Sequence, residues 1–200
     1  MRLNVKLLIL SPLIPKETDF VIKLLPKAAA AGLTPITISN TTIIEIDTLT
    51  LTSISANKGK SEKLSEQLKK SHGMSLPHNG RASGRQGARA LWFGQHTLLV
   101  GPKCDEKLNK FAILTDQSDA WVVLRMSGDL IENVLMRLTP VDIRLKTFKV
   151  GSVVRTGLLH VNVTLHRVGA NTIDVYGFRS MAKTLCHELT QALSTVAARD

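Results

Sequence analysis

The sequence has few of the residues that most often mark a metal, redox or nucleic-acid site. Cysteine occurs only at Cys104 and Cys186, far apart and outside any CxxC pair, which excludes a disulfide framework and a cysteine-based metal or redox motif. Aromatic residues make up 4% of the chain and do not interleave with basic positions, as a stacking platform for nucleic acid requires. We therefore expect no metal site and no nucleic-acid partner.

Long apolar runs are also missing. The run Leu7–Leu10 follows Arg2 and Lys6, but it is short and no small-residue cleavage pattern follows it, so we do not expect a signal peptide. No stretch approaches the length that spans a membrane. A P-loop and a dinucleotide fingerprint are both absent. These features predict a cytoplasmic protein without membrane contact and without a flavin or NAD site of its own.

What the chain does have is apolar content and unevenly placed charge. Over 200 residues, 44% hydrophobic content can fill a substantial core. The net charge is +10, and residues 58–110 hold eleven Lys or Arg against four Asp or Glu. This surplus predicts a basic face directed at the acidic surface of a partner protein, with an ordinary solvated surface as the alternative. The candidate partner-facing residues are Arg81, Arg85 and Arg89.

Two of these arginines lie in a stretch rich in glycine, residues 77–87 (PHNGRASGRQG). Its composition predicts a loop. A loop of glycine and arginine can also cradle a phosphate or carboxylate, but no known anion-binding fingerprint is present. We expect a flexible surface connection in preference to an anion site.

The clearest local pattern runs from Leu114 to Leu138. Residues Ala120–Met126 form a short apolar run rich in β-branched residues, which predicts a largely buried strand. Ser127 follows with a side-chain oxygen suited to cap a helix. Apolar residues then recur at helical spacing through Leu138. We expect a strand, a tight turn and an amphipathic helix that Ser127 caps.

Strand patterns surround this unit. Residues 88–93 and 96–100 flank Gly94 and Gln95 and predict a hairpin. Residues 160–166 alternate between polar and apolar side chains, as a strand with two different faces does. These patterns predict an α+β fold, a two-lobed α/β sandwich of mostly antiparallel sheet with helices on one face.

We expect three parts in the chain. Residues 1–34 contain three prolines and predict an N-terminal arm that lies on this chain or on a partner. Residues 35–105 form the first α+β lobe, and residues 106–200 form the second.

No arrangement of residues predicts catalysis. His160 and His166 lie six residues apart on one face of a strand, about 20 Å when extended, so they cannot share a metal ion. We expect the six histidines to be solvated or locally hydrogen-bonded. Asp116 and Asp119 flank Gln117 and Ser118, a spacing that favours a turn over acid–base chemistry. We therefore predict no catalytic, cofactor-binding or metal-ligating residue on this chain.

Four separate segments carry a family resemblance. They are residues 87–94 (GARALWFG), 113–125 (ILTDQSDAWVVLR), 137–144 (RLTPVDIR) and 178–182 (FRSMA). In this order and spacing they resemble the gamma subunit of heterotetrameric sarcosine oxidase, a family related to the aminomethyltransferase-like folate-binding proteins. The resemblance runs from about Pro35 to the C-terminus.

This resemblance implies a two-lobed fold like that of the folate-binding aminomethyltransferases, and a non-catalytic subunit with a structural or assembly role. The complex would demethylate sarcosine oxidatively to glycine, with hydrogen peroxide and formaldehyde or 5,10-methylenetetrahydrofolate as the other products. The implied partners are the alpha, beta and delta subunits. FAD, FMN, NAD and tetrahydrofolate would be held by these other subunits.

Two other functions remain open at this stage. One is a stand-alone folate-binding enzyme or regulator of the aminomethyltransferase type. The other is a basic nucleic-acid-binding module, which the low aromatic content makes the weakest of the three.

Overall fold

The computed structural model describes residues 26–46 and 50–199. Its elements, in chain order, are β1 (Ile36–Ile38), β2 (Thr41–Glu45), β3 (Thr50–Ala56), α1 (Ser61–His72), β4 (Ala82–Arg85), β5 (Ala88–Phe93), β6 (His96–Gly101), the 3-10 helix η2 (Glu106–Lys110), β7 (Ala112–Asp116), β8 (Trp121–Ser127), α2 (Ile131–Leu135), β9 (Val153–Leu158), β10 (Val161–Gly169), β11 (Thr172–Phe178), the 3-10 helix η3 (Arg179–Met181) and α3 (Ala182–Ala197).

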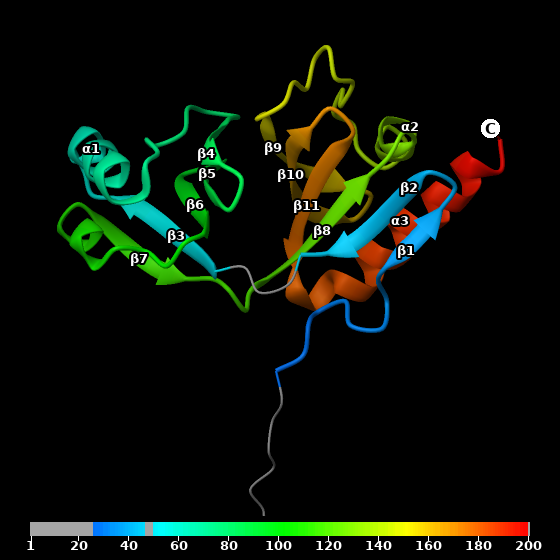
Figure 1. Cartoon of the computed structure of the whole chain (residues 1–200), viewed down its shortest axis with the longest axis horizontal. Coiled ribbons are helices and arrows are strands. Elements are labelled where there is room, and N and C mark those ends of the chain that lie inside the picture. Colours follow the sequence, from blue (N-terminus) through cyan, green and yellow to red (C-terminus); the bar gives the residue numbers. More distant parts are fainter. Residues whose placement is uncertain (1–25, 47–49, 200) are drawn as a thin grey trace, which may run out of the picture.

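The strands form two sheets, and every pairing within them is antiparallel. The six-stranded sheet has the order β1-β2-β8-β11-β10-β9, and the five-stranded sheet has the order β4-β5-β6-β3-β7. Figure 1 shows the two sheets facing each other, with α1 on one side of the pair and α2 and α3 on the other. The predicted α+β fold, with antiparallel sheets that carry helices on one face, is confirmed.

Three buried clusters hold these layers together. Leu64 and Leu68 of α1 pack with Ile54 and Leu99 under the five-stranded sheet. The inner faces of the two sheets share a second cluster. Its members are Leu51, Leu91, Phe93, Leu98 and Val100 from one sheet and Val123, Val153 and Tyr176 from the other. The arrangement is a four-layer sandwich of helix, sheet, sheet and helix.

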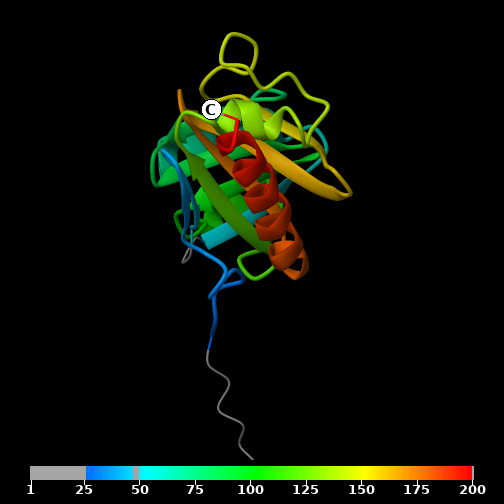
Figure 2. The ribbon, with the colours of Figure 1, turned by 90° about the vertical axis from the view of Figure 1, so that its right-hand side faces the viewer.

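The largest cluster lies on the outer face of the six-stranded sheet. Leu185, Leu189 and Leu193 of α3 pack there, and Figure 2 shows this helix lying along the sheet. Leu135 from α2 joins the same cluster. Alternate side chains of the strands therefore belong to different layers, one set to the helices and one to the space between the sheets.

The sheets divide the chain differently from the predicted lobes. Strands β1 and β2 come before the predicted boundary at residue 105, yet they belong to the six-stranded sheet. Strand β7 comes after that boundary and belongs to the five-stranded sheet. The reason is long-range pairing: Ile43 of β2 lies opposite Met126 of β8, and both are fully buried. A division by position along the chain misses such exchanges between sheets.

Most of the predicted N-terminal arm, with the run Leu7–Leu10, lies outside the described residues. Its last part packs against the six-stranded sheet. The carboxylate of Glu45 accepts hydrogen bonds from the backbone N–H groups of Ala29 and Ala30 at 2.9 and 2.8 Å. Among the described residues, no helix has both the length and the apolar character needed to cross a bilayer.

The expected helix after β8 is shorter than predicted, and Ser127 does not cap it. Ser127 is the last residue of β8, where it lies opposite Thr42 and Thr172 in the sheet. The helix α2 begins at Ile131, and Thr41, from a strand distant in sequence, accepts a hydrogen bond from the N–H of Leu130 at 3.2 Å. The cap thus comes from tertiary structure, while the predicted strand is confirmed.

Two further predictions concern the five-stranded sheet. The hairpin around Gly94 is confirmed, since β5 and β6 pair with Phe93 opposite His96. The prediction of a loop over residues 77–87 is wrong in part, because β4 lies within it and pairs with β5. Ser83 opposite Ala90 and Gly84 opposite Arg89 give this short polar strand backbone partners that its composition did not reveal.

Candidate functional site

The three arginines predicted to face a partner lie in different surroundings. Arg81 and Arg85 are exposed, whereas Arg89 is partly buried. The guanidinium of Arg81 donates to the hydroxyl of Ser152 at 2.9 Å and to the carbonyl of Val150 at 3.3 Å, so it joins the two sheets at their edge. The prediction that these residues contact a partner remains a prediction. For Arg89 the structure adds an internal contact.

That contact belongs to a charged row at one end of the space between the sheets. Arg125, Asp174 and His166 lie directly opposite one another on the neighbouring strands β8, β11 and β10. Asp174 accepts two hydrogen bonds from Arg125, at 2.7 and 2.9 Å. Arg89 reaches this row from the facing sheet, with its Nη1 3.2 Å from Nε2 of His166. Because guanidinium only donates, Nε2 must be the acceptor.

The buried position of His166 fixes its charge. Burial, with smaller contributions from the positive charges of Arg89 and Arg125, lowers the pKa of His166 from 6.5 to about 3. The imidazole is therefore neutral near pH 7 and carries its proton on Nδ1. That Nδ1 is buried and has no hydrogen-bond partner among the described residues. The prediction that all histidines are solvated or locally bonded is wrong for His166, because the second sheet covers the polar face of β10.

A small cavity opens beside this row. Its volume is about 60 Å³, and Arg89, Arg125, Asp174 and Tyr176 contribute to its lining. Burial and the nearby Asp174 raise the pKa of Tyr176 far above its usual range, so its hydroxyl stays protonated. The charged end of the inter-sheet space therefore combines two guanidinium groups, one carboxylate and two neutral polar side chains.

The opposite end of the same space is aromatic. Trp121 and Phe178 are cross-strand neighbours and stack with ring centroids 4.9 Å apart. Phe93 from the other sheet meets Trp121 edge-on at 5.0 Å. The guanidinium of Arg155 lies 5.0 Å from the ring centre of Phe93 and donates to its carbonyl at 3.3 Å. This cluster, Phe93, Trp121, Arg155 and Phe178, joins the sheets by stacking and cation–π contacts.

Two larger cavities adjoin the aromatic cluster, with volumes of about 350 and 420 Å³. Trp121, Arg155 and Phe178 line both of them. The second cavity adds His96, whose Nδ1 lies 2.7 Å from the hydroxyl of Ser55. Concave surfaces with aromatic walls and a few polar groups are typical of small-molecule sites. These two cavities are candidate ligand sites.

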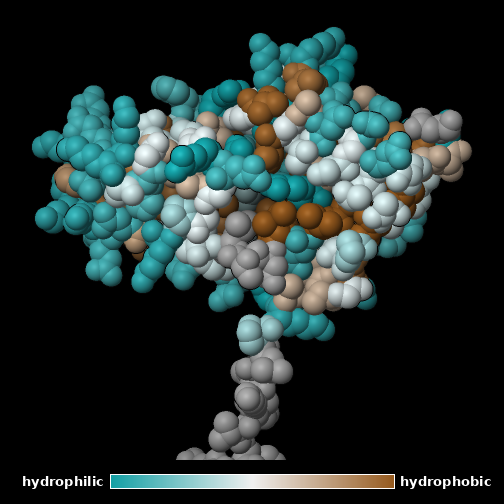
Figure 3. All heavy atoms as spheres, viewed as in Figure 1, coloured by the Kyte–Doolittle hydropathy of each residue, from teal (hydrophilic) through white to brown (hydrophobic). Residues whose placement is uncertain are grey.

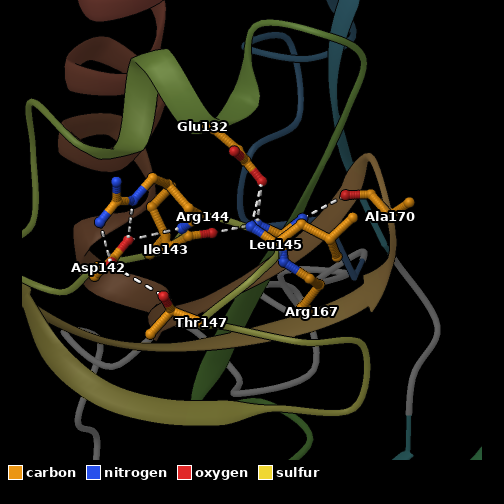
Figure 4. A network of polar contacts seen from close by, with 8 residues as sticks. All are labelled: Glu132, Asp142, Ile143, Arg144, Leu145, Thr147, Arg167 and Ala170. Carbon is orange, nitrogen blue, oxygen red and sulfur yellow. Dashed lines mark hydrogen bonds and ion pairs between the residues drawn. The ribbon is translucent and has the colours of Figure 1, made fainter.

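A second polar network lies on the outer face of the six-stranded sheet (Figure 4). The side chain of Arg167 is fully buried and donates to the carboxylate of Glu132 at 2.9 Å and to the carbonyls of Ile143 and Ala170. Its guanidinium lies 5.9 Å from the ring centre of Phe148. One buried arginine thus holds α2, the β10–β11 turn and the segment after α2 together.

The same network shapes the long connection between α2 and β9. Glu132 also accepts from the backbone N–H of Leu145 at 2.8 Å. Asp142 accepts two bonds from the guanidinium of Arg144, at 2.8 and 2.7 Å, one from the backbone N–H of Arg144 at 3.2 Å and one from Thr147 at 3.1 Å. These bonds hold the pKa of Asp142 well below its usual range, with the side-chain bond from Arg144 as the largest cause. The connection is fixed by its own polar contacts, although it contains no helix or strand.

Asp116, one of the two aspartates considered for catalysis, has a structural partner. Asp116 accepts from the backbone N–H and the hydroxyl of Ser118 at 2.9 and 2.6 Å, which confirms the predicted turn. The same two bonds lower the pKa of Asp116. Within residues 26–46 and 50–199, no three His, Cys, Asp or Glu side chains gather in a group that could hold a metal ion.

Sequence reasoning did not find the two ends of the inter-sheet space. Phe93, Trp121 and Phe178 come from three of the four segments that carry the family resemblance, but nothing in one strand shows that these segments meet. The Arg89–His166 contact spans 77 positions. The alternation in β10 identified the face of His166 correctly and left open what covers it.

The architecture is that of the aminomethyltransferase-like fold, which sarcosine oxidase subunits share. The chain is similar to a chain of the heterotetrameric sarcosine oxidase from Corynebacterium sp. U-96, solved in complex with pyrrole 2-carboxylate. The TM-score is 0.75 at 22% sequence identity, and the match covers 87% of this chain and 97% of that one. It is also similar to the glycine cleavage system aminomethyltransferase T from Bartonella henselae. Here the TM-score is 0.53 at 14% identity, and the match covers 76% of this chain and 46% of that one.

At these identities the likeness establishes the fold. No protein-family model matches the sequence, and a comparison with curated proteins finds no match either.

Proposed function

We propose that this chain is the gamma subunit of a heterotetrameric sarcosine oxidase, with a structural and assembly role and no chemistry of its own. The observation that carries the proposal is the extent of the fold match. The chain covers 97% of the sarcosine oxidase chain but only 46% of aminomethyltransferase T. A subunit of the same size and outline is a closer counterpart than an enzyme of about twice the matched length.

The arrangement of the resembling segments supports the same proposal. Phe93, Trp121 and Phe178, from residues 87–94, 113–125 and 178–182, meet in the aromatic cluster. The remaining segment, residues 137–144, supplies Asp142 and Ile143 to the polar network around Arg167. Segments that resemble the gamma subunit in sequence therefore build the two main contact networks of the fold.

The proposed complex contains alpha, beta and delta subunits besides this chain. In it, FAD, FMN, NAD and tetrahydrofolate are bound by the other subunits. The sheet pairings favour this division, because dinucleotide cofactors are commonly held by parallel β-α-β units with a glycine-rich turn. In the described part of this chain both sheets are antiparallel.

The test is assembly. The four subunits are produced together, with and without this chain, and the products are analysed by size-exclusion chromatography, flavin absorbance and peroxide release from sarcosine. We expect a complete complex only when the chain is present, and no flavin absorbance or peroxide from the chain alone. A complete, active complex that forms without it, or peroxide from the isolated chain, would contradict the proposal.

The two larger cavities favour a second candidate function, binding of a folate by a protein of the aminomethyltransferase type. Trp121 and Phe178 provide aromatic surface, and Arg155 provides a positive charge. Calorimetric titration of the isolated chain with tetrahydrofolate separates the candidates. Saturable binding that Trp121→Leu abolishes would favour the folate-binding function, while the absence of heat would leave the assembly role as the better account.

A further inference from the structure

The charged end of the inter-sheet space holds more positive charge than its described side chains neutralise. Asp174 uses both carboxylate oxygens to accept from Arg125. Arg89 forms no ion pair with any described residue, and its hydrogen bond goes to the neutral ring of His166. Among the described side chains at this end, two guanidinium groups and one carboxylate leave one positive charge in excess.

This excess lies where solvent can compensate it only in part. Arg89 is partly buried, and both His166 and Asp174 are buried beside it. Removing a charge from water without a counter-charge is unfavourable, and the cost falls when an anion pairs with it. The surroundings of Arg89 are thus suited to an anion.

The cavity beside Arg89 has a defined shape. The turn before β5 forms one wall, and Val100 and Gly101 of β6 continue it. Gly101 has φ +105°, and a Cβ there would collide with the carbonyl oxygen of Gly87. Glycine therefore lets these two backbone segments lie in contact behind Arg89. The six-stranded sheet closes the other side with Arg125 and Tyr176.

The size of the cavity limits its occupant. About 60 Å³ is several times the roughly 10–15 Å³ of comparable volume that one water requires. It suits a group of three or four non-hydrogen atoms and excludes a sugar acid or a pterin ring. Guanidinium groups match the planar geometry of a carboxylate with two parallel hydrogen bonds. The protonated hydroxyl of Tyr176, which also lines the cavity, is a further donor.

We propose that the cavity between Arg89 and Arg125 is a binding site for a small free carboxylate, of the size of formate or acetate. Such an anion neutralises the excess charge of Arg89 while Asp174 stays paired with Arg125. The site lies at the opposite end of the inter-sheet space from the aromatic cluster and its cavities. It is independent of the proposed assembly role.

The test uses the purified full chain and two sodium salts at equal ionic strength, formate and gluconate. Both are carboxylates, and only formate fits the cavity. A ligand that binds the folded chain alone raises the folding equilibrium constant by the factor 1 + [L]/Kd. At ten times Kd this is about elevenfold, equivalent to about 1.4 kcal/mol in urea-induced unfolding. We expect this saturating increase with formate and not with gluconate.

A matched pair of variants locates the effect. Arg89→Met removes the charge and keeps the length of the side chain, and we expect it to abolish the difference between formate and gluconate. Arg85→Met removes the same charge from an exposed position in the neighbouring strand, and the difference should persist. If Arg89→Met fails to fold, Arg89→Lys, which keeps the charge without the planar fork, should bind formate with a weaker Kd.

Nuclear magnetic resonance of the unaltered chain provides a direct measurement. The amide signals of Gly87, Arg89 and Gly101 should shift on one saturating curve with formate. Equal effects of formate and gluconate, or an unchanged formate effect in Arg89→Met, would overturn the proposal. If formate has no effect but Arg89→Met weakens subunit assembly, the carboxylate belongs to a partner side chain, and a free ligand is excluded.

Discussion

His166 and Arg167 are neighbours in β10, but their side chains lie on opposite faces of the six-stranded sheet. On the outer face, Arg167 is fully buried and meets one carboxylate, two carbonyls and an aromatic ring. On the inner face, His166 accepts one bond from Arg89, and its Nδ1 has no partner among the described residues. Both side chains are fully buried, and each leaves one ring or guanidinium nitrogen without a partner, but Arg167 makes more polar contacts than His166.

The difference separates polar groups that maintain the fold from polar groups that are available for a ligand. In the network of Arg167 both Nη atoms have acceptors and only Nε lacks one, so this network fixes one conformation and has little capacity for a further partner. The inner face keeps a partly buried guanidinium beside a cavity, at the cost of unpaired polar atoms. We therefore assign structure to the outer face and expect binding at the inner face.

The largest change in the free energy of unfolding should follow from removing the polar contacts of Arg167 on the outer face. Arg167→Met keeps much of the side-chain volume but removes the charged partner of Glu132 and a donor to each of two carbonyls, so we expect a loss of about 3–5 kcal/mol in the free energy of unfolding. Urea denaturation measures it. The control is Arg144→Met, which removes an exposed ion pair in the same loop and should change stability little. Similar losses in both variants would show that burial of Arg167 is not what makes its network stabilising.

The next largest change in the free energy of unfolding should come from truncating a buried apolar side chain on the outer face. Leu135 of α2 is fully buried, so Leu135→Ala should cost about 2–5 kcal/mol through a cavity beneath the helix. Its neighbour Met136 is 52% exposed, and Met136→Ala should remain within about 0.5 kcal/mol. Chemical denaturation of the pair is the measurement. A change below about 1 kcal/mol for Leu135→Ala would remove this residue from the core.

The contrast between the faces also marks what the sequence could and could not predict. The fold class, strand β8 and the hairpin of β5 and β6 were predictable, because apolar alternation and turn residues act locally. The cap of α2 was not, because Thr41 reaches Leu130 from 89 positions away. A serine in the expected place was therefore interpreted as a cap although the strand continues through it.

The candidate site was less predictable than the fold. Charge counting selected the stretch that holds all three arginines, but it could not separate exposed Arg81 and Arg85 from partly buried Arg89. The row of Arg125, Asp174 and His166 depends on the register of three strands, and register is set by the whole sheet. The sequence analysis placed Gly87 in a loop, whereas the contact of its carbonyl with Gly101 behind the cavity is a property of the folded chain alone.

His166 on the inner face should make the free energy of unfolding depend on pH, with an effect of intermediate size. The pKa of His166 is about 3 in the folded chain and 6.5 in its ordinary state. Between these values the unfolded chain binds a proton that the folded chain does not, so stability is full above about pH 6.5 and falls as the pH decreases toward 3. The slope from this residue is at most about 1.4 kcal/mol per pH unit.

Urea denaturation at a series of pH values tests this assignment. His166→Gln removes the titrating group and should flatten the dependence between about pH 4 and 6. His160→Gln, at an exposed position just before β10, is the control and should leave the dependence unchanged. Equal curves for the original chain and His166→Gln would assign the acid sensitivity to carboxylates elsewhere.

The smallest change in stability is expected for Arg81 and Arg85. These two residues extend the comparison to the surface. Figure 3 shows hydrophilic side chains over the end of the molecule that carries α1, and more apolar surface near the middle of this face. Arg81→Glu with Arg85→Glu should lower the free energy of unfolding by only about 1 kcal/mol, because both residues are exposed and the change removes just the hydrogen bonds of Arg81 to Ser152 and Val150. If the pair meets an acidic surface, association with the other subunits of the proposed complex should slow by about tenfold at low salt, and the difference should shrink as salt is added.

Surface-binding kinetics across a salt series give the association rate and its dependence on salt. The matched control is Lys69→Glu with Lys70→Glu, which makes the same change in net charge on exposed positions of α1. Steering by total charge predicts equal slowing in the two double variants, since the field of the whole protein then governs encounter. A local contact predicts slowing by the arginine pair alone, because rim charges act within about a Debye length of their partners. Unchanged rates in the arginine variant at low salt would exclude a partner contact at Arg81 and Arg85 and leave partly buried Arg89 as the one candidate of the three with a binding role.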